Sequence, residues 1–123
     1  IQQQSTFCIR GDGTEKRDYL FIDDFLSMMS LVANSSHQSA ETGLLNVCSG
    51  VSSSINSLVE IAERVSGESL RLEFSPPSMS DPKVVAMSPE LARNTLGWQA
   101  SRTLEDGIAQ TWQWMQERNA PAS

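Results

Sequence analysis

The stretch Gly11-Asp12-Gly13-Thr14-Glu15-Lys16-Arg17-Asp18-Tyr19-Leu20-Phe21-Ile22-Asp23-Asp24 joins a glycine turn, a charged run, an apolar run and an acidic pair. Two glycines that flank a single residue are typical of a tight turn, because glycine adopts positive φ angles without strain. The apolar run over residues 19–22 predicts a short strand. Asp23 and Asp24 then supply a cap and first-turn acids for a helix that we expect to run to about Ala33.

The rest of the chain alternates short strands and helices without a repeat. The apolar patterns predict strands at residues 6–10, 43–48 and 70–74 and helices at residues 54–66, 89–96 and 104–115. Gly67 and Gly97 are expected to end the first two of these helices. Thr103 and Asp106 have the spacing of a capping box at the start of the last one. We therefore expect an α/β fold, as a small α+β-like domain with short strands, about four helices and a sheet edge that needs cover.

Length and charge limit the classes of protein. The sequence has 123 residues, with 9 Lys and Arg against 15 Asp and Glu, and a formal net charge of −6. A chain of this length forms one modest core, so we expect a single domain over residues 1–123. Binding to a nucleic-acid backbone needs a basic face, which argues against a nucleic-acid partner. No apolar stretch approaches the roughly 18 residues of a membrane-spanning helix, so no membrane partner is expected.

The sulfur and imidazole groups do not form a recognisable site. Cys8 and Cys48 stand far apart in separate apolar runs, and we expect two buried free thiols in a reducing cytoplasm. His37 is the single histidine and lies in a polar run, so we expect a loop residue and no nucleophilic triad or metal centre. The sequence begins at Ile1 rather than at Met, which we interpret as a trimmed start.

Three collinear segments carry a resemblance to the extended short-chain dehydrogenase/reductases, the superfamily of the NAD-dependent nucleotide-sugar epimerases and dehydratases. Residues 11–24 resemble the family stretch GDGTQxRD(F/Y) and the helix start that follows it. Residues 45–50, Leu-Asn-Val-Cys-Ser-Gly, are similar to the family's Y-N-V-G-S-G. Residues 76–98 are similar to its P-x-R-x-G-D-P loop and LGW helix end. The resemblance covers residues 7–116 and implies a partial domain, the carboxy-terminal substrate-binding region, which lacks the Rossmann half.

The resemblance implies two substrate-binding residues, Arg17 and Asp81, with residues 75–84 as the substrate-side loop. Arg17 matches the arginine that binds the diphosphate of a nucleotide sugar, a role that suits a guanidinium with paired hydrogen bonds. The alternative is a strand-surface arginine paired with Asp18 or Glu15. Asp81 matches the carboxylate that accepts hydrogen bonds from the ribose hydroxyls. The alternative is a turn-forming aspartate before a proline.

The loop also departs from the family pattern. Ser78 stands where the family has a second diphosphate-binding arginine, and Ser80 replaces the loop glycine. Lys83 is the nearby cation that we expect to compensate as a point charge. In the second segment Cys48 replaces a glycine, so we expect that its backbone is not left-handed.

The motifs for cofactor and catalysis are not found in these residues. A dinucleotide site needs a third glycine after Gly11-Asp12-Gly13, and the single tyrosine, Tyr19, has Asp23 rather than Lys four residues later. We therefore expect no catalytic residue and no cofactor in this chain, with NAD bound only where a Rossmann domain or partner supplies its site. The expectation is a nucleotide-sugar-binding domain of an epimerase or dehydratase that is catalytically inactive alone.

Two alternatives remain open. In a split epimerase, this chain completes the active site of a separate Rossmann-domain chain. In a non-enzymatic interaction module, the surface that faces the Rossmann half in the family is covered in a homodimer. Five aromatic residues are candidates for that surface: Phe7, Phe74, Trp98, Trp112 and Trp114. We expect most of them to lie in the core instead.

Overall fold

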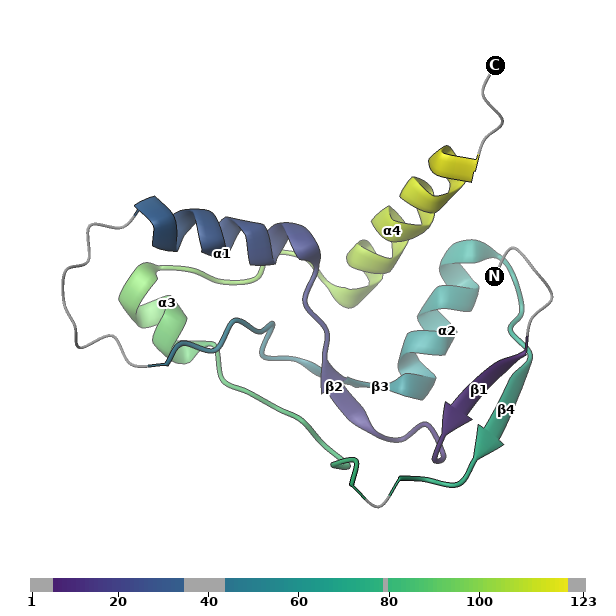
Figure 1. Ribbon diagram of the computed structural model, residues 1–123. Coiled ribbons are helices and arrows are strands. Elements are labelled where there is room, and N and C mark those ends of the chain that lie inside the picture. The colour runs from purple at the N-terminus through teal and green to yellow at the C-terminus, as the bar shows by residue number, and fades with distance from the viewer. Residues whose placement is uncertain (1–5, 35–43, 79, 120–123) are drawn as a thin grey trace.

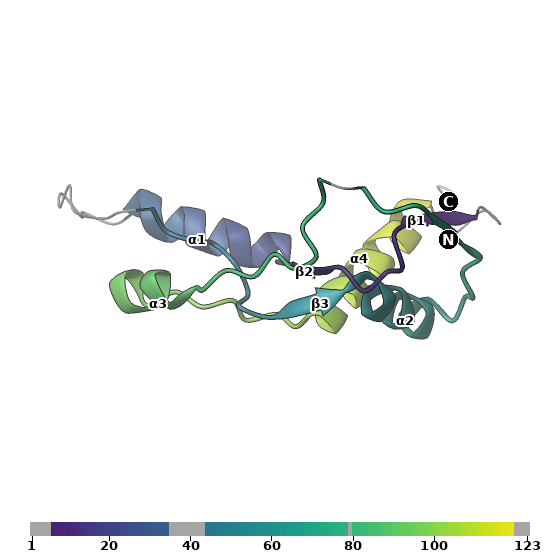
Figure 2. The same ribbon diagram turned by 90° about the horizontal axis from the view of Figure 1, so that it is seen from below.

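The computed structural model describes residues 6–34, 44–78 and 80–119. Some predictions lie outside the described residues. They concern Ile1, His37, the first residue of the strand at 43–48, and the chain after residue 119. The described part is elongated and open, with α1 and α3 at one end, α2, α4, β1 and β4 at the other, and β2 and β3 between them (Figure 1). A view turned by 90° shows that these elements form a thin layer (Figure 2).

The expected mixed α/β class is confirmed, with four helices and short strands in the residues described. The elements are β1 (Phe7–Arg10), β2 (Lys16–Asp18), α1 (Ile22–Asn34), β3 (Ser52–Ser54), α2 (Ile55–Ser66), β4 (Leu72–Ser75), α3 (Glu90–Leu96) and α4 (Leu104–Asn119).

The strands form two separate two-stranded sheets in the described part of the chain. β1 pairs in parallel with β4, from Phe7 with Leu72 to Arg10 with Ser75. β2 pairs antiparallel with β3, so that Arg17 lies opposite Ser53. The other edge of β2 is also paired, because the Lys16 N–H donates to the Lys83 carbonyl at 2.9 Å, and the Val85 N–H donates to the Lys16 carbonyl at 3.0 Å. The loop at 75–84, expected to lack regular structure, is thus attached to β2 at its end.

The strand predicted over residues 19–22 is wrong. β2 lies before this run and α1 begins within it, at Ile22. The run's side chains pack instead against helices. Leu20 contacts the core cluster, and Phe21 lies so close to α4 that a Cβ added at Gly107 would stand 3.1 Å from Phe21 Cδ2. Leu20 and Phe21 are therefore apolar because they pack against other elements, and their burial does not require a strand.

The strand predicted over residues 43–48 is also wrong in the part described, residues 44–48, which form no ladder. Leu45 and Val47 pack against the core cluster, and Cys48 is fully buried. Ordered pairing begins later, at the serine strand β3, whose side chains give no apolar signal. Among the described residues no non-glycine has a positive φ angle, so the expectation that Cys48 is not left-handed is confirmed.

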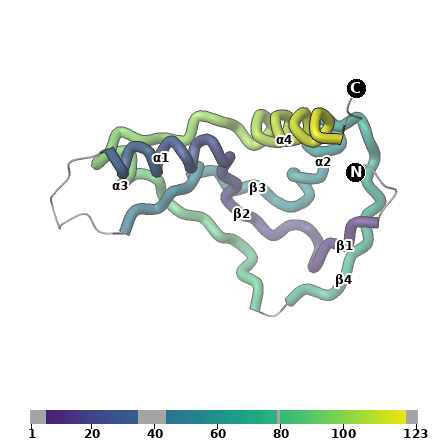
Figure 3. Tube along the Cα trace, turned by 45° about the horizontal axis from the view of Figure 1, so that its top comes forward, coloured from purple at the N-terminus to yellow at the C-terminus, as the bar shows by residue number. Residues whose placement is uncertain are grey.

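The main core cluster joins α1 to the segment around α3. Met28 of α1, Ala92 of α3 and Trp98 are each at most 5% exposed, and Leu45, Val47 and Leu96 pack against them. The Trp98 indole N–H donates to the Ser27 hydroxyl at 2.9 Å, which satisfies its buried donor. Figure 3 shows α1 and α3 side by side at this end of the molecule.

The predicted glycine ends of α2 and α3 and the predicted capping box of α4 are confirmed. For α1 the first-turn acids are confirmed but the cap is wrong, because the helix begins at Ile22, before Asp23 and Asp24. The Ser54 hydroxyl accepts the Ser57 N–H at 3.0 Å at the start of α2, and Gly67 ends this helix in the left-handed conformation. Gly97 ends α3 in the same way, while the Ser88 hydroxyl accepts the Glu90 N–H at 3.2 Å at the start of α3. The capping box of α4 is formed by Thr103 and Asp106. None of the helices in the described ranges is both long and apolar enough to cross a membrane.

Asp24 joins α1 to the segment that leads into α4. Its carboxylate is 4% exposed and accepts the Ser101 N–H at 3.0 Å, the Ser101 hydroxyl at 2.8 Å and the Arg102 N–H at 3.0 Å. Burial by itself raises the pKa of Asp24, but these hydrogen bonds, together with the charge of Arg102, lower the pKa overall. Asp24 therefore links segments far apart in the sequence rather than capping its own helix.

The Asp24 contact predicts a pH-dependent contribution to stability. Because the folded-state pKa lies below the unfolded value of 3.8, the contribution is present above that value and is lost as the pH falls through the folded pKa. We expect Asp24→Asn to lower the free energy of unfolding at pH 7 by about 2 kcal/mol. The difference from wild type should shrink as the pH is lowered from 3.8 through the folded pKa of Asp24.

Urea unfolding followed by circular dichroism at pH 7 and at pH 3 measures both values. Asp23→Asn is the matched control, because Asp23 is the exposed neighbour in the same helical turn and should change stability by at most about 0.5 kcal/mol. Equal losses for the two variants at pH 7 would contradict the role assigned to Asp24.

Candidate functional site

Arg17 lies on β2 and reaches the substrate-side loop. Its side chain is half-buried, and Nη1 donates to the Lys16 carbonyl and to the Pro82 carbonyl, each at 2.9 Å. Among the residues described, the guanidinium makes no ion pair with Asp18 or Glu15, the alternative partners considered above. The structure therefore brings Arg17 against the loop between Asp81 and Lys83.

Asp81 and Lys83 are exposed residues on either side of Pro82. The Asp81 N–H donates to the Ser78 carbonyl at 3.2 Å, which closes a turn over the residues that depart from the family pattern. The hydroxyls of Ser78 and Ser80 lie 2.9 Å apart in this turn. The turn fits both the ribose-binding and the turn-forming interpretations of Asp81, so its role stays a prediction.

Three cations have their backbones where β2 meets the loop. The backbones of Lys16 and Lys83 are hydrogen-bonded, and Arg17 follows Lys16 in the chain. Because Lys16 and Arg17 are consecutive strand residues, their side chains leave opposite faces of β2. The pKa of Asp12 is lowered first by hydrogen bonds from Thr14 and in smaller part by the charge of Lys83. Lys83 therefore lies close enough to Asp12 for the two charges to interact.

Asp18 holds the other face of β2. Its Oδ1 accepts the Ser49 N–H and its Oδ2 accepts the Gly50 N–H, both at 2.8 Å. Gly50 has a φ angle of 79°, and a Cβ there would stand 3.0 Å from Pro89 Cδ, so the turn itself needs glycine. Sequence reasoning considered Asp18 only as a partner for Arg17. The sequence signal for this contact was that Asp18 and the Ser49-Gly50 pair both lie in segments that resemble the family motifs.

The two thiols differ in environment. Both are free, as expected, but Cys8 on β1 is exposed, so the prediction that it is buried is wrong. A β-prone run does not reveal which side chains of a two-stranded sheet are covered. Burial, followed by the charge of Asp18, raises the pKa of the buried Cys48 thiol. A raised thiol pKa disfavours the nucleophilic thiolate at Cys48.

The glycine turn after β1 does not fit a dinucleotide. The Gly11 N–H donates to the Ser75 carbonyl, and the Thr14 N–H donates to the Asp12 carboxylate. A Cβ at Gly13 would overlap the Asn56 amide, so the space beside this glycine is filled by the Asn56 side chain. A phosphate site needs that space to be open. This turn therefore offers no site for the NAD diphosphate.

Glu15 is a buried acid without a partner for one oxygen. Its side chain is 7% exposed, and Oε2 is buried with no hydrogen-bond partner. The carboxylate lies against Gly11, where an added Cβ would stand 2.5 Å from Oε1. The family stretch quoted above has glutamine at this position, and an uncharged amide is less costly to bury than a carboxylate.

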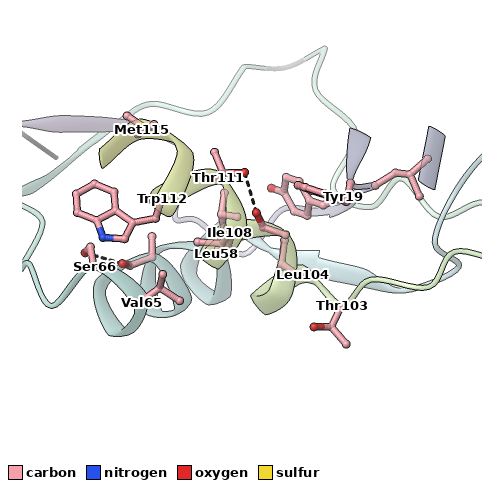
Figure 4. A pocket seen from close by; sticks show the side chains of 14 residues that line it. Tyr19, Leu58, Val65, Ser66, Thr103, Leu104, Ile108, Thr111, Trp112 and Met115 are labelled. Atoms are coloured by element: carbon pink, nitrogen blue, oxygen red, sulfur yellow. Dashed lines mark hydrogen bonds between the residues drawn. The ribbon is translucent and has the colours of Figure 1, made fainter. Parts of the chain in front are cut away.

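An apolar groove runs between α2 and α4 (Figure 4). Its cavity volume is about 280 Å³, and side chains from both helices and from the run at 19–21 line it, including Leu58, Val65, Ile108, Trp112 and Met115. Arg64 and Glu105 form a bidentate ion pair across the two helices at 3.0 and 3.1 Å. Because both side chains are more than half exposed, solvent screens the pair and it contributes little to stability.

The aromatic residues considered for an interface are distributed unevenly. Trp98 is buried in the core cluster and Trp112 lies in the groove. Phe7, Phe74 and Trp114 are 50%, 57% and 53% exposed, so these three are the surface candidates.

Comparisons with known proteins agree with this architecture. The UDP-glucuronic acid 4-epimerase from Bacillus cereus, solved in complex with UDP-glucuronic acid and NAD, superposes with a TM-score of 0.84 at 22% identity. The match covers 94% of this chain and 36% of that protein. The arrangement of short strands and helices is therefore the same as in part of that protein.

Sequence comparison identifies the family. The profile of the GDP-mannose 4,6 dehydratase family matches residues 1–111. The UDP-glucose 4-epimerase of Halalkalibacterium halodurans is 27% identical over 107 residues, which cover 86% of this chain and 32% of that protein. That of Neisseria meningitidis serogroup C is 30% identical over 104 residues, covering 85% and 31%. The chain belongs to this family of NAD-dependent nucleotide-sugar epimerases and dehydratases, and it spans about a third of the length of these relatives.

The orphaned oxygen of Glu15 predicts a stabilising substitution. Leaving a buried acceptor unsatisfied costs about 1–3 kcal/mol, and more when the group is charged. We expect Glu15→Gln to raise the free energy of unfolding by about 1 kcal/mol at pH 7, measured by urea unfolding. Glu73→Gln, at an exposed position of β4, is the control and should leave stability unchanged. A destabilised Glu15→Gln protein would show that the carboxylate has a partner.

Proposed function

We propose that this chain forms the nucleotide-sugar-binding part of an NAD-dependent epimerase or dehydratase. The observation that carries the proposal is the hydrogen bond from Arg17 Nη1 to the Pro82 carbonyl at 2.9 Å. It joins a strand arginine to the loop that carries Asp81, which the family motifs associate with the nucleotide, and Lys83, the nearby cation expected to compensate for the missing arginine. The family assignment and the nucleotide-sugar complex of the Bacillus cereus relative support the same substrate class.

Arg17 is suited to a diphosphate. A guanidinium has five N–H donors in a planar fork, and the two of Nη1 are used by the Lys16 and Pro82 carbonyls. The donors on Nε and Nη2 are then available for phosphate oxygens, as a charge-assisted pair. The half-buried position strengthens these bonds relative to those of a fully exposed arginine.

The substrate-side loop supplies the remaining contacts in this proposal. The exposed Asp81 carboxylate accepts hydrogen bonds from ribose hydroxyls, with its backbone held by Ser78. Lys83 contributes a point charge that partly replaces the arginine absent at Ser78. Its charge is shared with Asp12, which limits the compensation.

Catalysis is proposed to require residues and NAD held outside this stretch. The glycine turn after β1 is filled by Asn56 and Glu15 and does not fit the cofactor. We infer that the chain alone is catalytically inactive, and that it works in the cytoplasm with Cys8 and Cys48 as free thiols.

A diphosphate role for Arg17 predicts a selective loss of binding. We expect Arg17→Ala to weaken UDP-glucose binding by about tenfold or more, because each hydrogen bond to a charged group contributes about 1.5–3 kcal/mol. Uridine has the same ribose but no diphosphate, so it should bind to Arg17→Ala with the same affinity as to wild type. Isothermal titration calorimetry measures UDP-glucose binding, and ligand-observed NMR measures uridine binding.

Arg71→Ala is the matched control, because Arg71 is an exposed arginine just before β4, on the far side of the β1 sheet from β2. Arg17→Lys should bind with intermediate affinity, since it keeps the charge but not the paired geometry. Unchanged UDP-glucose binding by Arg17→Ala would remove the proposed role.

The exposed apolar surface also supports the proposal that this chain associates with another protein chain. Ile22 and Leu26 of α1 are 57% and 55% exposed, and the groove between α2 and α4 is apolar. Such surfaces are covered by a second protein surface, either a Rossmann-domain chain or another copy of this chain. We expect analytical ultracentrifugation of the purified chain to show self-association. A clean monomer at high micromolar concentration would contradict the homodimer and leave the separate Rossmann-domain chain as the partner.

A further inference from the structure

Arg17 and Asp18 are consecutive residues of β2, and their side chains leave opposite faces of the strand. Arg17 reaches the Pro82 carbonyl in the substrate-side loop. Asp18 reaches the backbone N–H groups of Ser49 and Gly50. The strand is thus held on one face by a carboxylate, while the guanidinium extends from the other.

β2 is only three residues long, so few hydrogen bonds fix its position. Its first residue, Lys16, pairs with Ser54 on one edge and bridges Val84 on the other. Its last residue, Asp18, pairs with Ser52 and adds the two carboxylate bonds, each 2.8 Å long. Figure 1 shows that the strand lies between the two ends of the molecule. The Asp18 carboxylate is therefore a principal tether of the end of β2 nearest α1.

The turn that Asp18 holds is itself fixed. The Ser49 hydroxyl accepts the Val51 N–H at 3.0 Å, and the left-handed Gly50 lies against Pro89. A two-oxygen contact with two successive N–H groups restricts both distance and orientation, as a single bond does not. Asp18 thus sets the position of β2 against a rigid neighbour.

We propose that Asp18 is a positioning residue for Arg17, which holds β2 so that the guanidinium meets a ligand diphosphate. This proposal rests on the diphosphate role proposed for Arg17. Asp18 itself contacts no ligand, because both of its oxygens face the turn at Ser49 and Gly50. Its effect on binding passes through the strand to Arg17.

A double-mutant cycle between Arg17 and Asp18 tests this inference in the purified protein. Asp18→Asn is expected to weaken UDP-glucose binding about five- to tenfold while uridine binding stays within twofold of wild type. In the Arg17→Ala background, Asp18→Asn should have no further effect on UDP-glucose, because the group that it positions is gone. Additive losses in the cycle would overturn the proposal.

Asp24→Asn is the matched control for a merely structural effect. Asp24 also accepts two successive backbone N–H groups, those of Ser101 and Arg102, but it lies on α1 rather than on β2. This variant should lower the melting temperature and leave the ratio of the UDP-glucose and uridine dissociation constants unchanged. An equal change of the ratio in both variants would show that general destabilisation, and not strand position, causes the effect.

Asp18→Glu provides a second variant that keeps the charge and both acceptor oxygens but displaces them by one methylene. It should show the same selective loss for UDP-glucose as Asp18→Asn, and wild-type binding by both variants would overturn the proposal. The outcome for Arg17→Ala separates the two levels of inference. If that variant binds UDP-glucose normally, the proposed function of Arg17 fails. If it binds weakly while the Asp18 variants bind normally, only the positioning role fails.

Discussion

Backbone N–H groups outside helices and strands need acceptors, and in this protein carboxylates supply many of them. Asp18 and Asp24 each accept two successive loop N–H groups. Glu63, Asp12 and Asp106 each accept one, from Leu70, Thr14 and Thr103. The excess of acids over bases, 15 against 9, thus has a structural use. Carboxylate side chains that accept loop N–H groups can hold the long connections in place, so few strands are needed for that purpose.

These contacts matter because the apolar core is small. The fully buried side chains among the described residues are few, and many large apolar residues of α1 are exposed. Two packed groups, one around Met28 and Trp98 and one between α2 and α4, are joined by β2, β3 and the segment at 98–103. Asp24 secures that segment, and Asp18 secures β2. Short polar links therefore determine how the candidate site is assembled from distant parts of the chain.

Local signals predicted the helices, the capping box of Thr103 with Asp106, and the helix ends at Gly67 and Gly97, because such signals depend on neighbours a few residues apart. The strands predicted at residues 6–10 and 70–74 correspond to β1 and β4, whereas those at 19–22 and 44–48 are not formed in the described residues. Leu20, Leu45 and Val47 pack against the core cluster instead, and the serines of β3 pair because β2 lies beside them. The family motifs indicated Arg17 and Asp81, and the missing loop arginine led to Lys83. They did not indicate Asp18, Asp24 or Glu15, whose environments depend on contacts between residues far apart in the sequence.

The acidity that serves the fold also affects how quickly an anionic ligand can arrive. A net charge of −6 repels a diphosphate at long range, whereas Lys16, Arg17 and Lys83 are cations whose backbones lie where β2 meets the loop. Charges beyond about 10 Å are screened at 0.1 M ionic strength, whereas contacts at hydrogen-bond distance are screened much less. For the nucleotide sugar proposed as ligand, the rate of encounter would therefore depend on the surrounding electrolyte. Dilute buffer would slow capture, and moderate salt would leave mainly the attraction of the nearby cations.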